Sequence, residues 1–363
     1  MKHKIYKYCL TMLRLLARFV QLGNPAGKAP TLLREPLDIK KIDVASQVSD
    51  NISVWQLYNT LCSGLYGGAV ITAQNQVMSR FLIYPWGKEL HPSLSFPYLG
   101  RKRANIDKAV FLITVATKGN YYHWVADLLP RLLLVQKCSF TDFHQRNIIL
   151  HSPAKGYERE TLRLLGIADE KVIRLQAFET IAIQDVLVAD YLHSRDGRIF
   201  PEWKKELLDE FKQKILGSVQ VKPQRRVYLL RGRQRTRKLL GEDRLVPILR
   251  EQGFEILDPQ HLTLVEQMKT LSEAAVVVAL HGAALANIIF CQEGTQIVEL
   301  RSSHKPPEYY SEIAKTYKLQ FETLSLEPER LLDPRHLANE QNLILSEKAI
   351  NDLLFKLQQT VAA

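Results

Sequence analysis

A histidine and an aspartate lie four residues apart in positions 120–131, which read Asn-Tyr-Tyr-His-Trp-Val-Ala-Asp-Leu-Leu-Pro-Arg. If this segment is helical, His123 and Asp127 share a face, because residues four apart in a helix are neighbours. An imidazole beside a carboxylate can act as a general base, since the carboxylate orients the ring and supports its charged form. The alternative is a half-buried histidine with an aspartate that caps the helix and pairs with Arg131.

Four arginines lie within seven residues at positions 231–237, which read Arg-Gly-Arg-Gln-Arg-Thr-Arg. They follow the short apolar run 226–230, so we expect Arg231 and Arg237 at the C-terminal end of a strand. Guanidinium groups bind phosphate through paired hydrogen bonds, and the segment is therefore interpreted as a phosphate clamp. The alternatives are a solvated basic loop and a nucleic-acid contact, the latter weakened by the lack of interleaved aromatic residues or a recognised motif.

The sequence His-Gly-Ala-Ala begins at His281, directly after the apolar run 275–280. Such a run is typical of a strand buried on both faces of a parallel sheet. We expect a helix at Ala283–Phe290, and the turn at Gly282 then leaves backbone N–H groups at the helix N-terminus able to bind a phosphate. His281 is either a polar plug or a contact to the ligand.

Two further polar side chains accompany this turn. Glu299 lies near the C-terminal end of the strand expected at 296–300, the edge at which open α/β sheets bind ligands. Its carboxylate can accept hydrogen bonds from a ribose, or it is an ordinary strand-end carboxylate. Asn287, in the predicted helix, can cap that helix or contact the same site.

The second half of the sequence alternates between strand-like and helix-like segments. Strands are expected at 226–230, 254–257, 275–280, 296–300 and 319–323, with helices between them at 242–252, 264–273, 283–290 and 308–317. Five strands with four crossovers predict a Rossmann-like sheet, so the arginines, His281 and Glu299 should share one sheet edge. A last helix at 346–359 can pack on either half.

The first half also alternates, less regularly. Strands are expected at 109–116, 147–151, 171–175 and 181–189, and helices at 120–134, 157–165 and 201–216. Pro130 should kink or end the first of these helices. Short alternating segments at 70–74 and 77–84 are typical of antiparallel or edge strands. The polar stretch 218–225 is the expected junction between an α/β domain at 23–217 and a Rossmann-like domain at 218–345, with 346–363 forming the terminal helix.

Residues 1–22 have the pattern of a basic amphipathic helix. At 100° per residue the basic side chains fall in one narrow sector, and apolar side chains fill the rest. Such a helix can lie on an anionic membrane surface, or it can pack on its own protein with a solvated basic face. Arg14 and Arg18 interrupt the apolar core that a signal peptide needs, and the segment is too short and too charged to span a bilayer.

The composition of the chain limits the classes of partner that it can bind. The chain has 363 residues, a net charge of +11 and 46% hydrophobic residues, which suits a two-domain globular protein with anionic partners. The 4 cysteines are scattered, which argues against a disulfide framework or a zinc site and fits a reducing compartment. The chain lacks a Gly-Lys-Ser/Thr loop, a Gly-x-Gly-x-x-Gly turn and an Asp-x-Asp motif. A diphosphate should therefore be neutralised by arginines and helix dipoles rather than by Mg²⁺.

The three motifs together resemble glycosyltransferase family 61. The resemblance rests on the 120–131 segment, the stretch 231–242 and His-Gly-Ala-Ala-Leu-Ala-Asn at 281–287 with Ile-Val-Glu-Leu at 297–300, and it spans roughly residues 105–325. It implies a GT-B fold with two Rossmann-like domains facing across a cleft, an inverting mechanism, a nucleotide-sugar donor and no required metal. Bacterial relatives act in capsular or other surface polysaccharide biosynthesis, and eukaryotic relatives act behind a membrane anchor.

We therefore expect an inverting glycosyltransferase, cytoplasmic or peripheral on the inner face of the cell membrane through residues 1–22. His123 or Asp127 is the expected base. The residues expected to bind the nucleotide-sugar donor are Arg231, Arg237, His281, Gly282, Ala283, Asn287 and Glu299. Those expected on the side of a saccharide or glycolipid acceptor are Asn120, Trp124 and Arg131. The rival hypotheses are a nucleotide-sugar epimerase of the same architecture and a non-catalytic saccharide- or nucleic-acid-binding protein.

Overall fold

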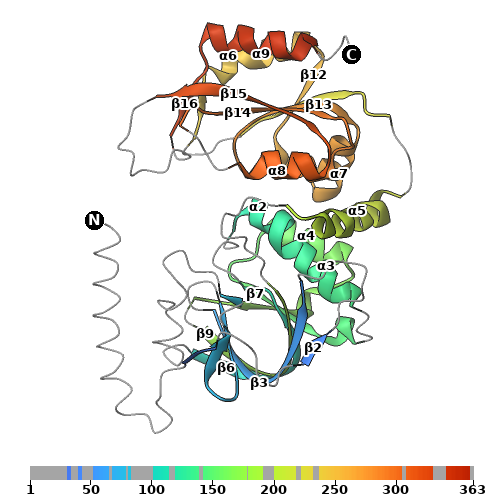
Figure 1. Ribbon diagram of the computed structural model, residues 1–363, viewed down its shortest axis with the longest axis vertical. Helices are drawn as coiled ribbons and strands as arrows, with labels where there is room; N and C mark the ends of the chain where they lie inside the picture. Colours follow the sequence, from blue (N-terminus) through green and yellow to red (C-terminus); the bar gives the residue numbers. More distant parts are fainter. Residues whose placement is uncertain are drawn as a thin grey trace. The chain divides into compact units, whose positions relative to one another are not determined.

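The computed structural model describes residues 31–33, 40–42, 52–64, 68–78, 81–82, 101–113, 119–138, 142–177, 179–190, 200–217, 222–231, 237–304, 308–329 and 341–359. The chain forms two compact units, residues 1–193 and 194–363, and each is built on one sheet (Figure 1). The helix predicted at residues 1–22 lies outside the described residues. Within those residues, no helix has the length and apolarity that crossing a membrane requires.

The second unit contains a seven-stranded sheet with the order β11-β16-β15-β14-β13-β10-β12. Its strands are β10 (Arg225–Leu229), β11 (Leu239–Leu240), β12 (Phe254–Leu257), β13 (Ala274–Leu280), β14 (Gln296–Ser302), β15 (Gln320–Pro328) and β16 (Leu343–Ile344). Five neighbouring strands, β12, β10, β13, β14 and β15 in spatial order, are parallel. Numbered by their order in the chain, they have the doubly wound arrangement 2-1-3-4-5. The order reverses between β10 and β13, and such a switch point is where open α/β sheets bind ligands.

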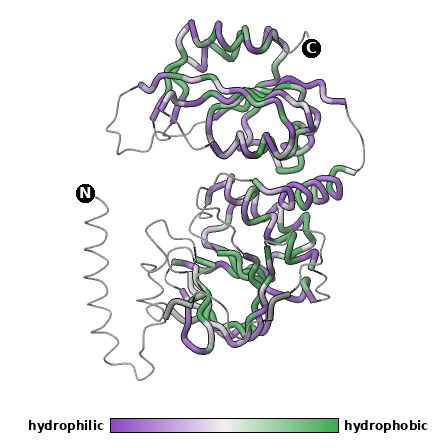
Figure 2. Tube along the Cα trace, in the orientation of Figure 1, coloured by the Kyte–Doolittle hydropathy of each residue, from purple (hydrophilic) through white to green (hydrophobic). Residues whose placement is uncertain are grey.

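Helices cover both faces of this sheet. They are α5 (Glu202–Leu216), α6 (Glu242–Glu251), α7 (Leu264–Ser272), α8 (Tyr309–Thr316) and α9 (Glu347–Gln359), with 3-10 helices η9 (Pro259–His261) and η10 (Ala283–Phe290). Figure 1 shows α6 and α9 on one face and α7 and α8 on the other. Figure 2 shows hydrophobic residues gathered along the central strands. Burial on both faces explains why β13 reads as a continuous apolar run, whereas β15 alternates between buried and exposed residues over its second half.

The predicted alternation of the second half is confirmed for its five parallel strands, and the short strands β11 and β16 were not predicted. The segment at Ala283–Phe290 is a 3-10 helix rather than an α-helix. Side chains three residues apart eclipse in such a helix, and Ala283 and Ala286 are small enough to do so. The predicted junction at 218–225 also lies too late, because α5 belongs to the second unit. Lys212 Nζ donates to the Phe290 carbonyl at 3.5 Å, and the Thr316 hydroxyl donates to the Phe200 carbonyl at 2.6 Å.

The last helix packs on the second unit. Leu353 and Leu357 of α9 are buried in the core formed with Val298 and Leu300 of β14. Lys356 Nζ also forms an ion pair with Glu322 of β15 at 2.7 Å. The sequence left open which half this helix covers, and these contacts settle its place.

The first unit contains a mixed sheet with the order β1-β5-β4-β3-β9-β6-β7-β8, and β2 pairs with β3. Its strands are β1 (Thr31–Leu33), β2 (Lys40–Ile42), β3 (Val54–Ser63), β4 (Ala69–Ile71), β5 (Gln76–Met78), β6 (Arg101–Phe111), β7 (Asn147–His151), β8 (Val172–Leu175) and β9 (Glu179–Ala189). Strands β6 to β9 form parallel pairs, whereas β3, β4 and β5 pair antiparallel. The α/β part and the antiparallel excursion were both predicted, but the sheet is mixed rather than Rossmann-like.

Two strands of this sheet differ from the predictions. Strand β3 was not predicted, because Asn59 adopts a φ of 53° and interrupts the two-residue alternation by which strands are recognised. Strand β6 begins at Arg101 and ends at Phe111, earlier than the predicted strand at 109–116. The helical elements are α2 (Tyr121–His123), the π-helix η6 (Trp124–Leu128), α3 (Leu129–Lys137), η7 (Phe143–Gln145), α4 (Gly156–Leu164) and η8 (Asp169–Lys171).

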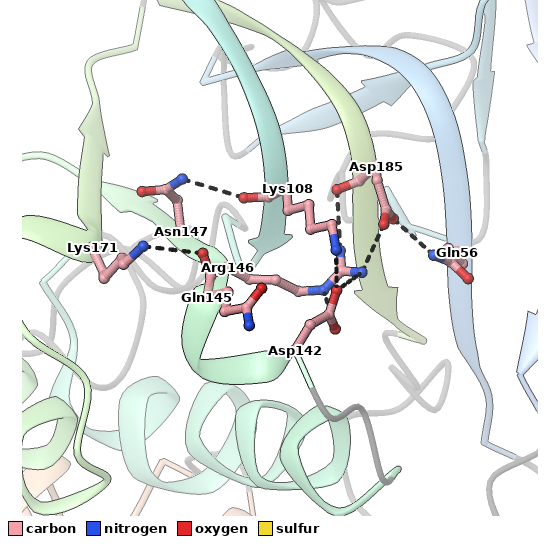
Figure 3. A network of polar contacts seen from close by, with 8 residues as sticks. All are labelled: Gln56, Lys108, Asp142, Gln145, Arg146, Asn147, Lys171 and Asp185. Atoms are coloured by element: carbon pink, nitrogen blue, oxygen red, sulfur yellow. Dashed lines mark hydrogen bonds and ion pairs between the residues drawn. The ribbon is translucent and has the colours of Figure 1, made fainter.

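A buried arginine ties three strands of the first unit together (Figure 3). The Arg146 side chain is 2% exposed and contacts Asp142 at 3.2 Å and Asp185 at 2.7 Å. Lys108 Nζ donates to Asp142 at 2.6 Å, and Gln56 Nε2 donates to Asp185 at 3.0 Å. Burial works to raise the pKa of Asp142, but the hydrogen bonds and charges of Lys108 and Arg146 hold it below its ordinary value. The charges of this network therefore stabilise one another.

Candidate functional site

The switch point of the second sheet brings two of the predicted motifs together. Arg231 follows β10, and His281 and Gly282 follow β13, the neighbouring parallel strand. Arg231 Nη1 donates to the His281 carbonyl at 2.9 Å. The expectation that these motifs share one sheet edge is thus confirmed, because parallel strands end at the same edge.

Arg231 is a desolvated cation. Burial lowers its pKa to about 10, and the charge of Arg237 acts in the same direction. No carboxylate of the described residues lies within 4.0 Å of its guanidinium, and its buried Nε has no hydrogen-bond partner. A guanidinium with that pKa still carries its charge at neutral pH. No carboxylate in the described part of the chain contacts this charge directly, and the more distant carboxylate of Glu242 compensates it only in part. Positions 232–236 of the predicted clamp lie outside the described residues.

Gly282 lets Arg231 approach the turn closely. A Cβ at Gly282 would lie 2.3 Å from Arg231 Nη1, so any other residue there would displace the guanidinium from this position, while the φ of 170° is accessible to any residue. Tyr310 of α8 packs its ring edge against His281 with centroids 5.2 Å apart, and its hydroxyl donates to the Gly282 carbonyl at 2.6 Å. Tyr310 gave no signal in the sequence, because only the packing of α8 brings it to this turn.

His281 forms a buried pair with Glu299. Its Nδ1 lies 2.5 Å from Glu299 Oε1, and the two side chains are 10% and 3% exposed. The pair follows from strand register: Ala279 lies opposite Glu299, and the His281 N–H donates to the Leu300 carbonyl at 2.8 Å. Arg301 Nη1 lies 3.7 Å from the other Glu299 oxygen. The predicted contact between Glu299 and a ribose stays a prediction, and in this structure the carboxylate faces protein groups.

Asn287 and Ala283 lie in η10 below the turn. Asn287 is fully buried and its Nδ2 donates to Gln267 Oε1 at 2.7 Å. Gln267 in turn donates to the carbonyls of Pro259 and Leu262 at 3.1 and 3.0 Å. Asn287 therefore anchors η10 to the start of α7, and its expected contact with the donor stays a prediction. Ala283 is partly exposed at the first position of η10, where the first backbone N–H groups have no intrahelical partner.

Glu242, the first residue of α6, holds the backbone of Arg231 by a hydrogen bond. It accepts a hydrogen bond from the Tyr228 hydroxyl at 2.7 Å and another from the Arg231 backbone amide. Burial raises its pKa despite these bonds and the charge of Arg231. Glu242 was not predicted to be part of the site, although its position directly after Gly241 at a helix start was a usable signal.

The first unit presents the predicted His123–Asp127 pair. His123 Nδ1 lies 2.7 Å from Asp127 Oδ2, with side chains 25% and 18% exposed. The four-residue spacing places them together although the segment is not a regular α-helix. Pro130 has no N–H to donate within the helix, and the π-helix η6 precedes it, with the Leu129 N–H bonded to the Trp124 carbonyl. Pro130 thus changes the winding without ending the helix.

The three residues predicted on the acceptor side support this pair in different ways. Asn120 is exposed and caps α2, accepting from the Tyr122 N–H at 3.0 Å. Trp124 is 2% exposed, and its indole N–H donates to the Thr161 hydroxyl at 3.0 Å. Arg131 is also buried, and it donates to the Ala189 carbonyl at the end of β9. Their contact with an acceptor stays a prediction, and the structure gives Trp124 and Arg131 packing positions.

Comparison with known families agrees with the motifs. The family model described as Glycosyltransferase 61 matches residues 121–298, a span that includes the His123–Asp127 pair, Arg231 and His281. No curated protein matches the chain. Among the described residues, no cluster of three or more histidine, cysteine, aspartate or glutamate side chains is arranged to hold a metal ion.

Proposed function

The chain belongs to the glycosyltransferase 61 family, and we propose that it transfers a sugar from a nucleotide-sugar donor to a saccharide or glycolipid acceptor with inversion at the anomeric carbon. In this proposal the second unit binds the donor and the first unit supplies the base, within a GT-B arrangement. The reaction forms a bond from an acceptor oxygen to the anomeric carbon and breaks the bond from that carbon to the diphosphate.

The observation that carries the proposal is the charge of Arg231, which no carboxylate of the described residues contacts directly and Glu242 compensates only in part. Withdrawing a cation from water without a carboxylate in contact costs free energy unless an anion arrives to pair with it, and Arg231 is partly buried in this way. Here the cation lies at the switch point of a doubly wound sheet, beside the first residues of η10, where backbone N–H groups also favour an anion. A nucleoside diphosphate supplies two phosphoryl groups for these donors.

The same groups would act in catalysis. The departing diphosphate gains negative charge as the bond to the sugar breaks, and fixed donors aimed at that charge stabilise the transition state more than the ground state. Arg231 is held in place by the His281 carbonyl and by Glu242 before any ligand binds. We propose that these cations and backbone donors replace a metal ion.

His123 and Asp127 are the proposed base. The pair is partly exposed and hydrogen bonded, so either His123 accepts the proton while Asp127 orients the ring, or Asp127 accepts it directly. The acceptor hydroxyl loses its proton as its oxygen attacks, and the pair carries that proton away. The proposed setting is the synthesis of a cell-surface polysaccharide at the cytoplasmic side of the membrane, as the family resemblance implies.

A ligand screen followed by a product assay tests the proposal. We expect one of UDP, GDP, ADP or CDP, or its sugar derivative, to raise the thermal unfolding midpoint, because a ligand that binds only the native state stabilises it. With that nucleotide sugar and a mixture of saccharide acceptors, the expected product is a glycoside with inverted anomeric configuration.

The same screen separates the rival functions. Conversion of the nucleotide sugar to its epimer without an acceptor would show an epimerase. Salt-sensitive binding to oligonucleotides, with no nucleotide sugar bound, would show a nucleic-acid-binding protein. Either result contradicts a glycosyltransferase.

A further inference from the structure

Glu299 occupies an unusual position for a ligand contact. Its side chain is 3% exposed, one oxygen lies 2.5 Å from His281 Nδ1 and the other lies 3.7 Å from Arg301 Nη1. A ribose hydroxyl would have to displace one of these partners to reach it. The position instead suits a carboxylate whose task is to hold His281.

The backbone of His281 and its ring are also held. Its N–H donates to the Leu300 carbonyl at 2.8 Å, and its carbonyl accepts from Arg231 at 2.9 Å. Its ring packs against Tyr310. Nothing about this residue resembles a side chain placed merely to fill space, because each backbone and ring contact fixes its direction.

The carboxylate also determines which ring nitrogen is available. An ionised carboxylate only accepts hydrogen bonds, so Nδ1 carries a proton when it faces Glu299. Nε2 lies across the ring from Nδ1 and therefore points away from β14. The turn that carries it also holds the Arg231 guanidinium. The Glu299 pair thus directs one specific atom.

We infer that Glu299 is a positioning residue that fixes His281 so that Nε2 binds a phosphoryl oxygen of the donor diphosphate. The inference rests on the proposed function and adds to it a role for Glu299 other than ribose binding. In the complex the ring carries protons on both nitrogens, one directed at Glu299 and one at the phosphoryl oxygen. The proton on Nε2 comes from solvent.

The charged groups around the ring agree with this role. Glu299 and Arg301 approach from β14, Arg231 from the end of β10 and Tyr310 from α8, and Arg237 interacts electrostatically with Arg231 and Tyr310. The buried carboxylate opposes the repulsion between an imidazolium and the arginines. A ligand with two negative charges then neutralises the positive charge that remains on the imidazolium and the arginines.

The test measures the affinity for inorganic pyrophosphate, which has phosphoryl groups and no ribose. Glu299→Gln keeps the shape and removes the charge, and His281→Asn removes the ring. We expect each change to weaken pyrophosphate binding about tenfold, and the double variant to bind no more weakly than His281→Asn, because Glu299 acts only through the ring. The matched control is Glu322→Gln, a carboxylate on the neighbouring strand β15, which should bind like the wild type.

A ribose-binding role gives a different result. In that case Glu299→Gln weakens binding of the best ligand among UDP, GDP, ADP and CDP but leaves pyrophosphate binding unchanged, and the inference is wrong. Additive losses in the double variant overturn it as well. If wild-type protein binds neither pyrophosphate nor any of these nucleotides, the proposed function fails instead.

A second measurement on the wild-type protein does not depend on folding of the variants. Nitrogen-15 NMR of labelled histidine reports which ring nitrogens carry protons. We expect Nδ1 of His281 to be protonated without ligand and both nitrogens to be protonated with pyrophosphate, with His281→Asn identifying the signals. An unprotonated Nε2 in the pyrophosphate complex contradicts the inference.

Discussion

Arg146 in the first unit is buried and Arg231 in the second is partly buried, and the two differ most in the carboxylates that contact them. Arg146 contacts the carboxylates of Asp142 and Asp185 (Figure 3). Burial opposes its charge, but these carboxylates outweigh burial and raise its pKa. Arg231 has no such partner among the described residues, and burial lowers its pKa to about 10.

The difference separates a structural charge from one that awaits a ligand. A matched ion pair completes the fold, and removing one member leaves the other unpaired. An unmatched cation destabilises the fold and is stabilised when an anion binds. We therefore expect the same substitution to have different effects at the two arginines. At Arg146 it should lower the free energy of unfolding, and at Arg231 it should weaken ligand binding.

The larger effect is expected at Arg146. Arg146→Met removes the cation that Asp185 and Asp142 share, and we expect the free energy of unfolding to fall by about 3 kcal/mol. Urea unfolding measures this change. Arg163→Met is the control, because its pair with Asp169 is exposed and its removal should leave the unfolding midpoint unchanged. If both variants lower the free energy of unfolding equally, burial of the Arg146 ion pairs does not add to the stability of the protein.

At Arg231 we expect a smaller effect, and we expect it on ligand affinity rather than on stability. Arg231→Met should weaken pyrophosphate binding at least about tenfold, or about 1.4 kcal/mol, while the unfolding midpoint stays the same or rises. Calorimetric titration and thermal unfolding on the same sample measure both. Arg250→Met, an exposed arginine on α6, controls for the loss of a positive charge. A large loss of stability with unchanged pyrophosphate binding would make Arg231 a second structural arginine.

The features that could be predicted from the sequence are those that depend on residues close together in the chain. The parallel strands of the second unit are apolar runs because both faces are covered, so their alternation with helices could be recognised. His123 and Asp127 could be paired because a spacing of four residues tolerates even the π-helix that Pro130 imposes. The shared sheet edge was predicted from the strand alternation, whereas the switch point that brings Arg231 to His281 follows from the strand order of the structure.

The features that were missed depend on register and packing. Glu299 meets His281 because β13 and β14 pair in one particular register, which no spacing in the sequence reveals. Tyr310 reaches Gly282 through the packing of α8. Strand β3 lost its alternation at Asn59, and the pair of Arg146 with Asp185 gave no signal because Asp185 lies in β9, 39 residues away in the sequence.

The central claim is that His123 and Asp127 start the reaction while the Arg231 and His281 turn binds the donor. It is tested most directly by measuring turnover and nucleoside diphosphate affinity in His123→Asn and Asp127→Asn. Loss of a general base costs about 10²–10⁴-fold in rate, so at least one variant should lose well over tenfold in turnover with its nucleotide affinity unchanged. If neither variant loses more than about tenfold, or if affinity falls as far as turnover, the assignment of the base to this pair is wrong.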